Sequence, residues 1–444
     1  MLNVTVWRSL SLRLAIVAIP LWFTVAVLIF NVGWRIKLII GVVFGVTLAA
    51  PAGGLLLAAF LAPLGRLIAE VTDPNIFRMG EAIVLAFLAG WVLRGEADRP
   101  GPRVPAPFIG ALFAATIVAS IAGLAWQLKQ RPGALAEAFD AFVHSYYLIA
   151  DRTGFIDGAR LLEGLALAAA TVTLFRQRPA LSVTLPAVLA GSASVAAVAS
   201  VLLWRGIAPT EILQRHTLGT SGISAHVADV NAAGSYFALV LCLALGMTVR
   251  AHPRHRVAWG AASIACGVGL WFTQSRTALA AASIVILVAA TWFIVGRLKP
   301  TVRAAAIGAM LVLGVGVGRH YPAPALFLSP QRALQHGFEN AHNNLLPIGA
   351  ELWLVGLGLF AAWIGAGLLR AVRALARKPR DARLLGITCG VATFAGTWLG
   401  GHPLLVSEVA FPFWIQYGLM VGLAGSTLLN AATDSVSGRA SDGI

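Results

Sequence analysis

A histidine and two asparagines stand at the start of a long apolar run: His342, Asn343 and Asn344 precede residues 345–369. Glu351 is the one charged residue in that run. A titratable imidazole at the boundary between membrane and water is placed to exchange a proton with a substrate lying on that surface. The same residues also fit a simple helix cap, in which an asparagine satisfies free N–H groups of the first turn. The pattern therefore leaves two hypotheses, an acid–base site led by His342 and a polar cap.

A second candidate is an arginine in a very short connection. Arg276 follows Ser275 between the apolar runs 258–273 and 277–296. A charge this close to lipid is costly unless it is paired or solvated, so such a residue is a functional candidate. A guanidinium suits a pyrophosphate because it can donate two parallel hydrogen bonds, whereas the structural alternative is a side chain that snorkels to the headgroups. Arg215, in the loop 204–230, offers a second positive charge.

Three further polar residues have both a structural and a functional interpretation. Asp229 can cap a helix that begins near Asn231, or it can pair with His226, and the cap is the preferred interpretation. His402 either lines the same pocket as the other candidates or is an ordinary polar loop residue. Glu351 lies at membrane depth and needs a partner there, either an arginine or a hydrogen bond from a neighbouring helix.

The composition requires a membrane protein. Of the 444 residues, 58% are hydrophobic and 11% are charged, and the mean hydropathy is +0.82. Repeated apolar runs of about 20 residues predict an all-α, polytopic bundle of about 12–14 transmembrane helices, since only a helix satisfies its own backbone in lipid. The net charge of +15 raises the possibility of nucleic acid. The arginines cluster instead in loops between apolar runs, so no nucleic-acid partner is expected.

The predicted spans set the positions of the candidate residues. Residues 38–65 are expected to form two short spans that divide at Pro51. The other spans are expected at 14–30, 80–93, 107–126, 160–175, 180–203, 231–249, 258–273, 277–296, 304–318, 345–369, 384–400 and 411–429. An amphipathic stretch at 134–147 predicts an interfacial helix. Residues 1–430 thus form one membrane domain, and residues 431–444 are expected to be a disordered cytoplasmic tail.

The distribution of arginine and lysine predicts an orientation. The most basic loops are 94–103, 176–178, 250–256, 297–303 and 370–383. Lysine and arginine are enriched on the cytoplasmic side of membrane proteins, so these loops are assigned to the cytoplasm. Because spans alternate, His342, Arg276, Arg215 and His402 are then all expected on the outer side.

Four short motifs resemble those of the O-antigen ligase and O-antigen polymerase superfamily, the lipid-linked glycan transferases of the bacterial envelope. Ala341-His342-Asn343-Asn344-Leu345, followed by Glu351 and Val355-Gly356-Leu357, resembles its signature. Gln274-Ser275-Arg276-Thr277-Ala278 resembles its Ser-Arg motif, and residues 229–234 resemble its Asp-x-Asn-x-x-Gly helix start. Gly401-His402-Pro403 before a final span fits as well. The matches lie between about 215 and 415, in the family's order.

The resemblance implies a GT-C-like glycosyltransferase. Its donor would be a glycan on undecaprenyl pyrophosphate, and its acceptor a hydroxyl of lipid A core or of another glycan. His342 would act on the acceptor hydroxyl, while Arg276 and Arg215 would hold the pyrophosphate; Ser275, Asn343, Asn344, Glu351 and His402 would support them. The expected location is the bacterial inner membrane, with the site facing the periplasm and membrane lipids around the bundle. The chemistry would be inverting and would need neither nucleotide nor metal, and no cofactor or metal site is expected.

Other functions stay open. An O-antigen or exopolysaccharide polymerase, or a protein-glycosylating member of the superfamily, would use the same chemistry on a different acceptor. A secondary transporter of envelope precursors belongs to a different class, and its polar residues would lie near the bilayer midplane. Most candidates here lie instead at helix ends, which favours an enzyme that works at the outer leaflet.

Overall fold

The computed structural model describes residues 20–21, 24, 33–72, 78–94, 107–129, 150–207, 222–227, 229–295 and 345–441. In parts of some helices, among them 345–351 and 431–441, only the backbone is described. The regular structure within these ranges is helical throughout, so the prediction of an all-α polytopic bundle is confirmed.

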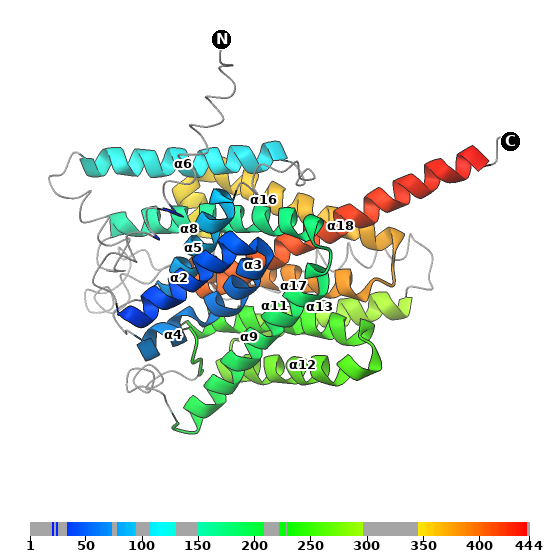
Figure 1. Cartoon of the computed structure of the whole chain (residues 1–444), viewed down its shortest axis with the longest axis horizontal. Coiled ribbons are helices and arrows are strands. Elements are labelled where there is room, and N and C mark those ends of the chain that lie inside the picture. Colours follow the sequence, from blue (N-terminus) through cyan, green and yellow to red (C-terminus); the bar gives the residue numbers. More distant parts are fainter. Residues whose placement is uncertain are drawn as a thin grey trace, which may run out of the picture.

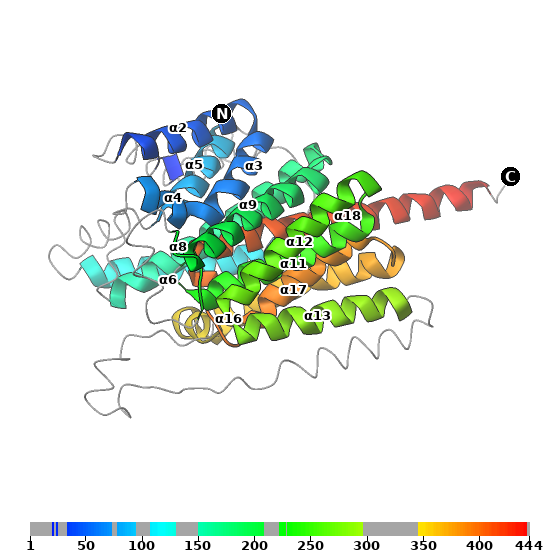
Figure 2. The ribbon, with the colours of Figure 1, turned by 90° about the horizontal axis from the view of Figure 1, so that it is seen from below.

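The helices follow one another with short connections. In chain order, the N-terminal part contains α2 (Trp34–Ala49), α3 (Pro51–Leu61), η1 (Ala62–Leu64), α4 (Gly65–Thr72), α5 (Met79–Leu93), α6 (Pro107–Lys129), α8 (Ala150–Gln177) and α9 (Leu181–Trp204). The C-terminal part contains α11 (Val230–Arg250), α12 (Pro253–Thr273), α13 (Arg276–Val295), α16 (Leu345–Arg377), α17 (Ala382–Thr397), η4 (Pro403–Leu405) and α18 (Ser407–Ser441). Figures 1 and 2 show that most of these helices share one long direction.

Six of the described helices are long and apolar enough to cross a membrane, and four more are apolar but shorter. The long ones lie in Pro51–Thr72, Asp157–Gln177, Leu181–Trp204, Val230–Arg250, Leu354–Arg377 and Ser407–Asn430. Each corresponds to a predicted span, so the chain is a membrane-embedded helical protein. The predicted spans 14–30 and 304–318 and the predicted interfacial helix 134–147 lie outside the described residues, apart from residues 20, 21 and 24.

The predicted division at Pro51 is confirmed. α2 ends at Ala49 and α3 begins at Pro51, which occupies the first helical position. Proline fits there because its missing N–H is one that the first turn leaves unbonded in any case. The two helices therefore replace one helix that would be too long for the bilayer.

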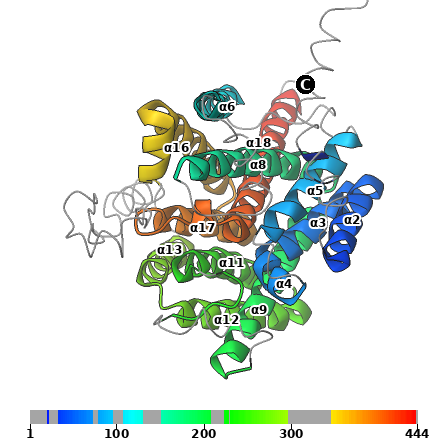
Figure 3. The ribbon, with the colours of Figure 1, turned by 90° about the vertical axis from the view of Figure 1, so that its left-hand side faces the viewer.

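The middle of the bundle is formed by α11, α17 and α18. Figure 3 shows α17 and α18 in the centre of the end-on view, with α6 and α16 on one side and α9 and α12 on the other. A Cβ atom at Gly386 would lie 2.7 Å from Cα of Gly246, so α11 and α17 touch backbone to backbone. Small residues permit this approach in membrane helices, where packing replaces the hydrophobic effect as the driving force. In α18, Trp414 and Tyr417 are fully buried.

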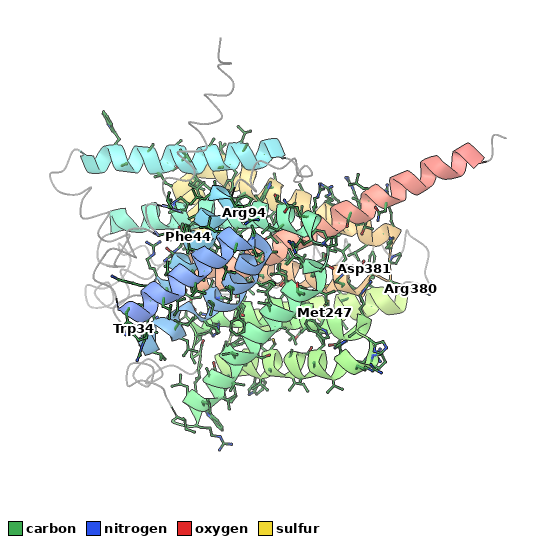
Figure 4. The ribbon with its side chains drawn as sticks, viewed as in Figure 1. Trp34, Phe44, Arg94, Met247, Arg380 and Asp381 are labelled. Atoms are coloured by element: carbon green, nitrogen blue, oxygen red, sulfur yellow. The ribbon has the colours of Figure 1, made fainter. Side chains whose placement is uncertain are left out.

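Basic side chains gather at one end of the bundle, here called the basic end. Arg250 lies 3.5 Å from Asp381, Arg383 donates to Ser182 Oγ at 2.6 Å, and Arg94 donates to the carbonyl oxygen of Ala49 at 2.9 Å. Figure 4 shows Asp381 and Arg380 toward one end and Trp34 at the other. The described parts of the loops predicted to share one side of the membrane thus lie at one end: residues 94, 176–178, 250–256 and 370–383.

Two boundaries differ from the predicted ones. α16 runs to Arg377, so Arg370, Arg373 and Arg377 belong to its last turns and not to a basic loop at 370–383. α18 runs to Ser441, so residues 431–441, predicted to be disordered, are helical and extend away from the bundle (Figure 1). In both cases the existing helix continues, because adding a residue to a helix costs far less than starting one.

Candidate functional site

The site is built on the start of α11, which Asp229 caps. Its Oδ1 accepts hydrogen bonds from the backbone N–H groups of Asn231, at 2.8 Å, and Ala232, at 3.2 Å. These are N–H groups that the helix itself leaves unbonded, and an aspartate is among the best residues to accept from them. The predicted capping role of Asp229 is therefore confirmed.

His402 reaches the other oxygen of the same carboxylate. Its Nε2 lies 3.3 Å from Asp229 Oδ2, and the two side chains keep 18% and 24% of their surface exposed. A carboxylate that accepts from one imidazole nitrogen fixes the orientation of the ring. His402 is therefore a partly exposed acid–base group held by the capped end of α11.

His226 is not the partner of Asp229. Its Nδ1 lies 3.2 Å from Ser224 Oγ, and its ring packs against Tyr236 and Phe237. Burial lowers the pKa of His226 to about 3. This histidine is therefore neutral at physiological pH and serves as a core side chain, so the alternative of a His226–Asp229 pair is wrong.

The connection between α12 and α13 is as short as predicted. Gln274 adopts a left-handed conformation with φ of 51°, and α13 begins at Arg276. Ser275 is buried, and its Oγ accepts from the N–H of Ala278 at 3.4 Å, so it caps α13. Arg276 is exposed in the first turn of α13. A guanidinium at a helix N-terminus adds a full charge to the partial positive charge of the helix dipole, which favours an anion.

Close backbone contacts bring these segments together at the end of the bundle opposite the basic end, here called the site end. A Cβ atom at Gly234 of α11 would lie 2.6 Å from the Cβ of Ser275. One at Gly400 would lie 2.7 Å from Thr277 Oγ1. With the Asp229–His402 pair, these contacts join the start of α11, the α12–α13 connection and the loop before η4. Three of the four sequence motifs therefore meet in one place.

The remaining predicted residues cannot be placed beside them. Arg215, His342, Asn343 and Asn344 lie outside the described residues. α16 begins at Leu345, directly after the asparagine pair in the sequence, and Glu351 lies in its first two turns with only its backbone described. The roles predicted for these five residues stay predictions.

A buried ionic cluster that was not predicted from the sequence lies behind the loop that carries His402. Arg160 of α8 donates from Nε to Glu81 Oε1 of α5 at 2.5 Å. Its NH1 donates to the carbonyl oxygen of Leu405 at 2.5 Å and to Asp157 Oδ1 at 3.3 Å. One arginine thus ties α5 and α8 to η4, three residues beyond His402.

Further charges surround this arginine. Arg78 pairs with the second oxygen of Glu81, and the buried carboxylates of Glu163 and Glu408 lie within electrostatic reach of Arg160. Ser407 donates to Glu408 Oε2 at 3.0 Å at the start of α18. One sequence signal could have revealed the cluster: charged residues occur inside apolar runs, where a charge is costly unless another group pairs with it.

Chemically, the site end offers an exposed cation at a helix N-terminus and, on neighbouring segments, an imidazole–carboxylate pair. Within the described ranges, no three His, Cys, Asp or Glu side chains are grouped so that they could hold a metal ion. Comparisons of the chain with family models, with curated proteins and with solved structures found no match.

Proposed function

We propose that the chain transfers a glycan from undecaprenyl pyrophosphate to an acceptor hydroxyl at the membrane surface, as an O-antigen ligase does. The observation that carries this proposal is that the segment carrying Arg276 packs against the segments that carry the Asp229–His402 pair, at the end of the bundle opposite the basic end. These segments lie far apart in the sequence, yet they are the ones whose motifs resemble a lipid-linked glycan transferase. A charged anchor and an acid–base group on one membrane face are what this reaction requires.

Arg276 is assigned to the pyrophosphate of the donor. Its guanidinium can donate two parallel hydrogen bonds to phosphate oxygens, and the free N–H groups of the first turn of α13 add to its positive field. Arg215, in the loop before α11, is assigned to the same pyrophosphate. The polyprenyl chain would lie in the lipid beside the bundle.

The reaction is a single displacement at the anomeric carbon of the donor sugar. The acceptor oxygen forms a bond to that carbon while the bond from the carbon to the pyrophosphate oxygen breaks, so the configuration inverts. The electron pair of the broken bond stays on the pyrophosphate, and the hydroxyl proton passes to a base, for which we propose His342. Pyrophosphate is a good leaving group, so the protein mainly supplies positioning and charge stabilisation.

The site end is proposed to face the periplasm, with the basic end in the cytoplasm of a bacterial inner membrane. Because Arg276 is exposed and Ser275 is buried, the informative replacement is Arg276→Cys. It should react with a membrane-impermeant maleimide in cells whose outer membrane alone is permeabilised, while Arg254→Cys at the basic end should not. Labelling of Arg254→Cys but not of Arg276→Cys would invert the proposed orientation.

Replacing Arg276 tests the assignment of the pyrophosphate. Arg276→Ala should weaken donor binding by about 10- to 100-fold, since a hydrogen bond between charged groups contributes about 1.5–3 kcal/mol. Arg276→Lys should recover only part of the loss, because an ammonium keeps the charge and loses the planar fork. Binding of a synthetic lipid-pyrophosphate glycan is the measurement, and Arg254→Ala, an exposed arginine in the first turn of α12, is the matched control. Equal binding by Arg276→Ala and wild type would show that Arg276 only anchors the helix end.

The same lipid-pyrophosphate glycan also tests two alternative functions, a polymerase and a transporter. A polymerase would use the same site with another donor-linked glycan as acceptor. A secondary transporter of envelope precursors is favoured by one observation, the ionic cluster of Glu81, Arg160 and Glu163 inside membrane-embedded helices, because buried charges often serve coupled transport. The ligase-like reaction is preferred because Arg276 and His402 lie at helix ends and not near the midplane.

A further inference from the structure

A groove opens beside the basic end, away from the site end. It lies between the first half of α9 and the first half of α12, with Met247 of α11 at its floor. Figure 2 shows α9, α12 and α11 side by side. Its lining consists mainly of small residues, among them Ala190, Gly191 and Ser194 from α9 and Ala258, Ala262 and Ala265 from α12.

The groove has the depth of one lipid leaflet. Along α9 it extends from Val183 to Ser194, which at 1.5 Å per residue corresponds to about 16 Å. Half of the hydrocarbon core of a bilayer is about 15 Å. The small, apolar walls leave room for a flexible acyl chain along this length, where larger side chains would have filled the space. The length of the groove therefore matches one lipid acyl chain that enters from the basic end.

Two arginines and two histidines surround the mouth of the groove. Arg250, His252, His255 and Arg383 all line it. Asp381 is the nearby carboxylate, 3.5 Å from Arg250. Arg383 donates from NH1 to Ser182 Oγ, but its buried Nε has no hydrogen-bond partner among the described residues. Buried donors on a charged group are costly to leave unbonded, so an anionic oxygen at this position would stabilise the protein.

We propose that this groove binds an anionic glycerophospholipid of the leaflet at the basic end. The phosphate accepts hydrogen bonds from Arg383 and Arg250, and one acyl chain lies between α9 and α12. A zwitterionic lipid carries an ammonium group that would face the same arginines, so it binds more weakly. The site lies at the opposite end of the bundle from Arg276, and the inference does not depend on the proposed function.

The charge requirement is tested on purified, delipidated protein by titration with single lipids under native mass spectrometry. Phosphatidylglycerol should bind more tightly than phosphatidylethanolamine of the same chain length. The double variant Arg250→Gln/Arg383→Gln should weaken phosphatidylglycerol binding by about 10- to 100-fold, as expected for loss of charge-assisted bonds. Arg254→Gln removes an exposed charge at the start of α12, outside the groove. This variant should therefore bind phosphatidylglycerol as tightly as wild type.

The groove itself is tested with a variant that keeps every charge. Ala262→Phe should fill the space between α9 and α12 and weaken the binding of both phospholipids, while Ile264→Phe, on the exposed face of α12, should not. Equal affinities for the two lipids, or an equal effect of Arg254→Gln and the double variant, would overturn the proposal. So would undecaprenyl phosphate binding more tightly than phosphatidylglycerol, because the occupant would then be a polyprenyl carrier.

Discussion

Alanine in place of His342 is expected to reduce glycan transfer by about 10²- to 10⁴-fold, the usual contribution of a general base. The acceptor hydroxyl must lose its proton as it attacks, and no other group is assigned to take it. Donor binding and membrane insertion should be retained, because the imidazole acts on the acceptor and the pyrophosphate is held by arginines. The measurement is the initial rate of transfer by purified variant and wild type at saturating donor.

His402→Ala is the informative comparison for that experiment. His402 pairs with Asp229, but Asp229 caps α11 through its other oxygen and keeps that role without the histidine. A loss of no more than about 10-fold is therefore expected for His402→Ala, the cost of one supporting group. If His342→Ala turned over at the wild-type rate, His342 would serve only as a helix cap. If His402→Ala then lost activity, the Asp229–His402 pair would be the acid–base group.

Removal of Arg160 should have the largest effect on stability. Its guanidinium bonds to Glu81, Asp157 and the carbonyl oxygen of Leu405, all in the buried ionic cluster. Arg160→Ala leaves two carboxylates without this partner at a buried site, a change that costs about 3–5 kcal/mol. The measurement is unfolding of the purified protein in mixed detergent micelles. Arg256→Ala, which removes an exposed arginine, is the control and should change stability by less than about 0.5 kcal/mol.

A second variant separates the ion pair from the size of the side chain. Arg160→Met/Glu81→Met removes both charges and keeps apolar volume, so it should be less destabilising than the sum of the two single methionine variants. Additive effects would mean that the two groups do not stabilise each other. Because Arg160 also holds the carbonyl of Leu405 near His402, the Arg160 variants should lose transfer activity before they lose the fold.

The parts of the fold that sequence reasoning predicted are those set by local chemistry. The division at Pro51 follows from the missing N–H of proline, and the cap at Asp229 follows from the free N–H groups that any helix start leaves. The two-residue connection before Arg276 followed from two apolar runs that nearly touch. Each feature depends on residues within a few positions of one another.

The ionic cluster could not be predicted in the same way. Arg160 bonds to Glu81, which is 79 positions away in the sequence, and to Leu405, which is 245 positions away. No periodicity in the sequence links these residues. The end of α16 was missed for a simpler reason. The residues between Arg370 and Arg377 are mostly alanine, leucine and arginine, which favour a helix, and Pro379 follows soon after. Charge alone had marked this segment as a loop.

The central claim is tested most directly by the purified wild-type protein with a synthetic undecaprenyl-pyrophosphate glycan, in the presence of a chelator and without nucleotide. One reaction receives lipid A core as acceptor, and another receives only the donor. We predict transfer with inversion at the anomeric carbon: capped core in the first reaction identifies a ligase, and chains longer than the donor glycan in the second identify a polymerase. No transfer to either acceptor by correctly inserted protein would contradict the proposed function, and uptake of the intact donor by proteoliposomes would point to a transporter.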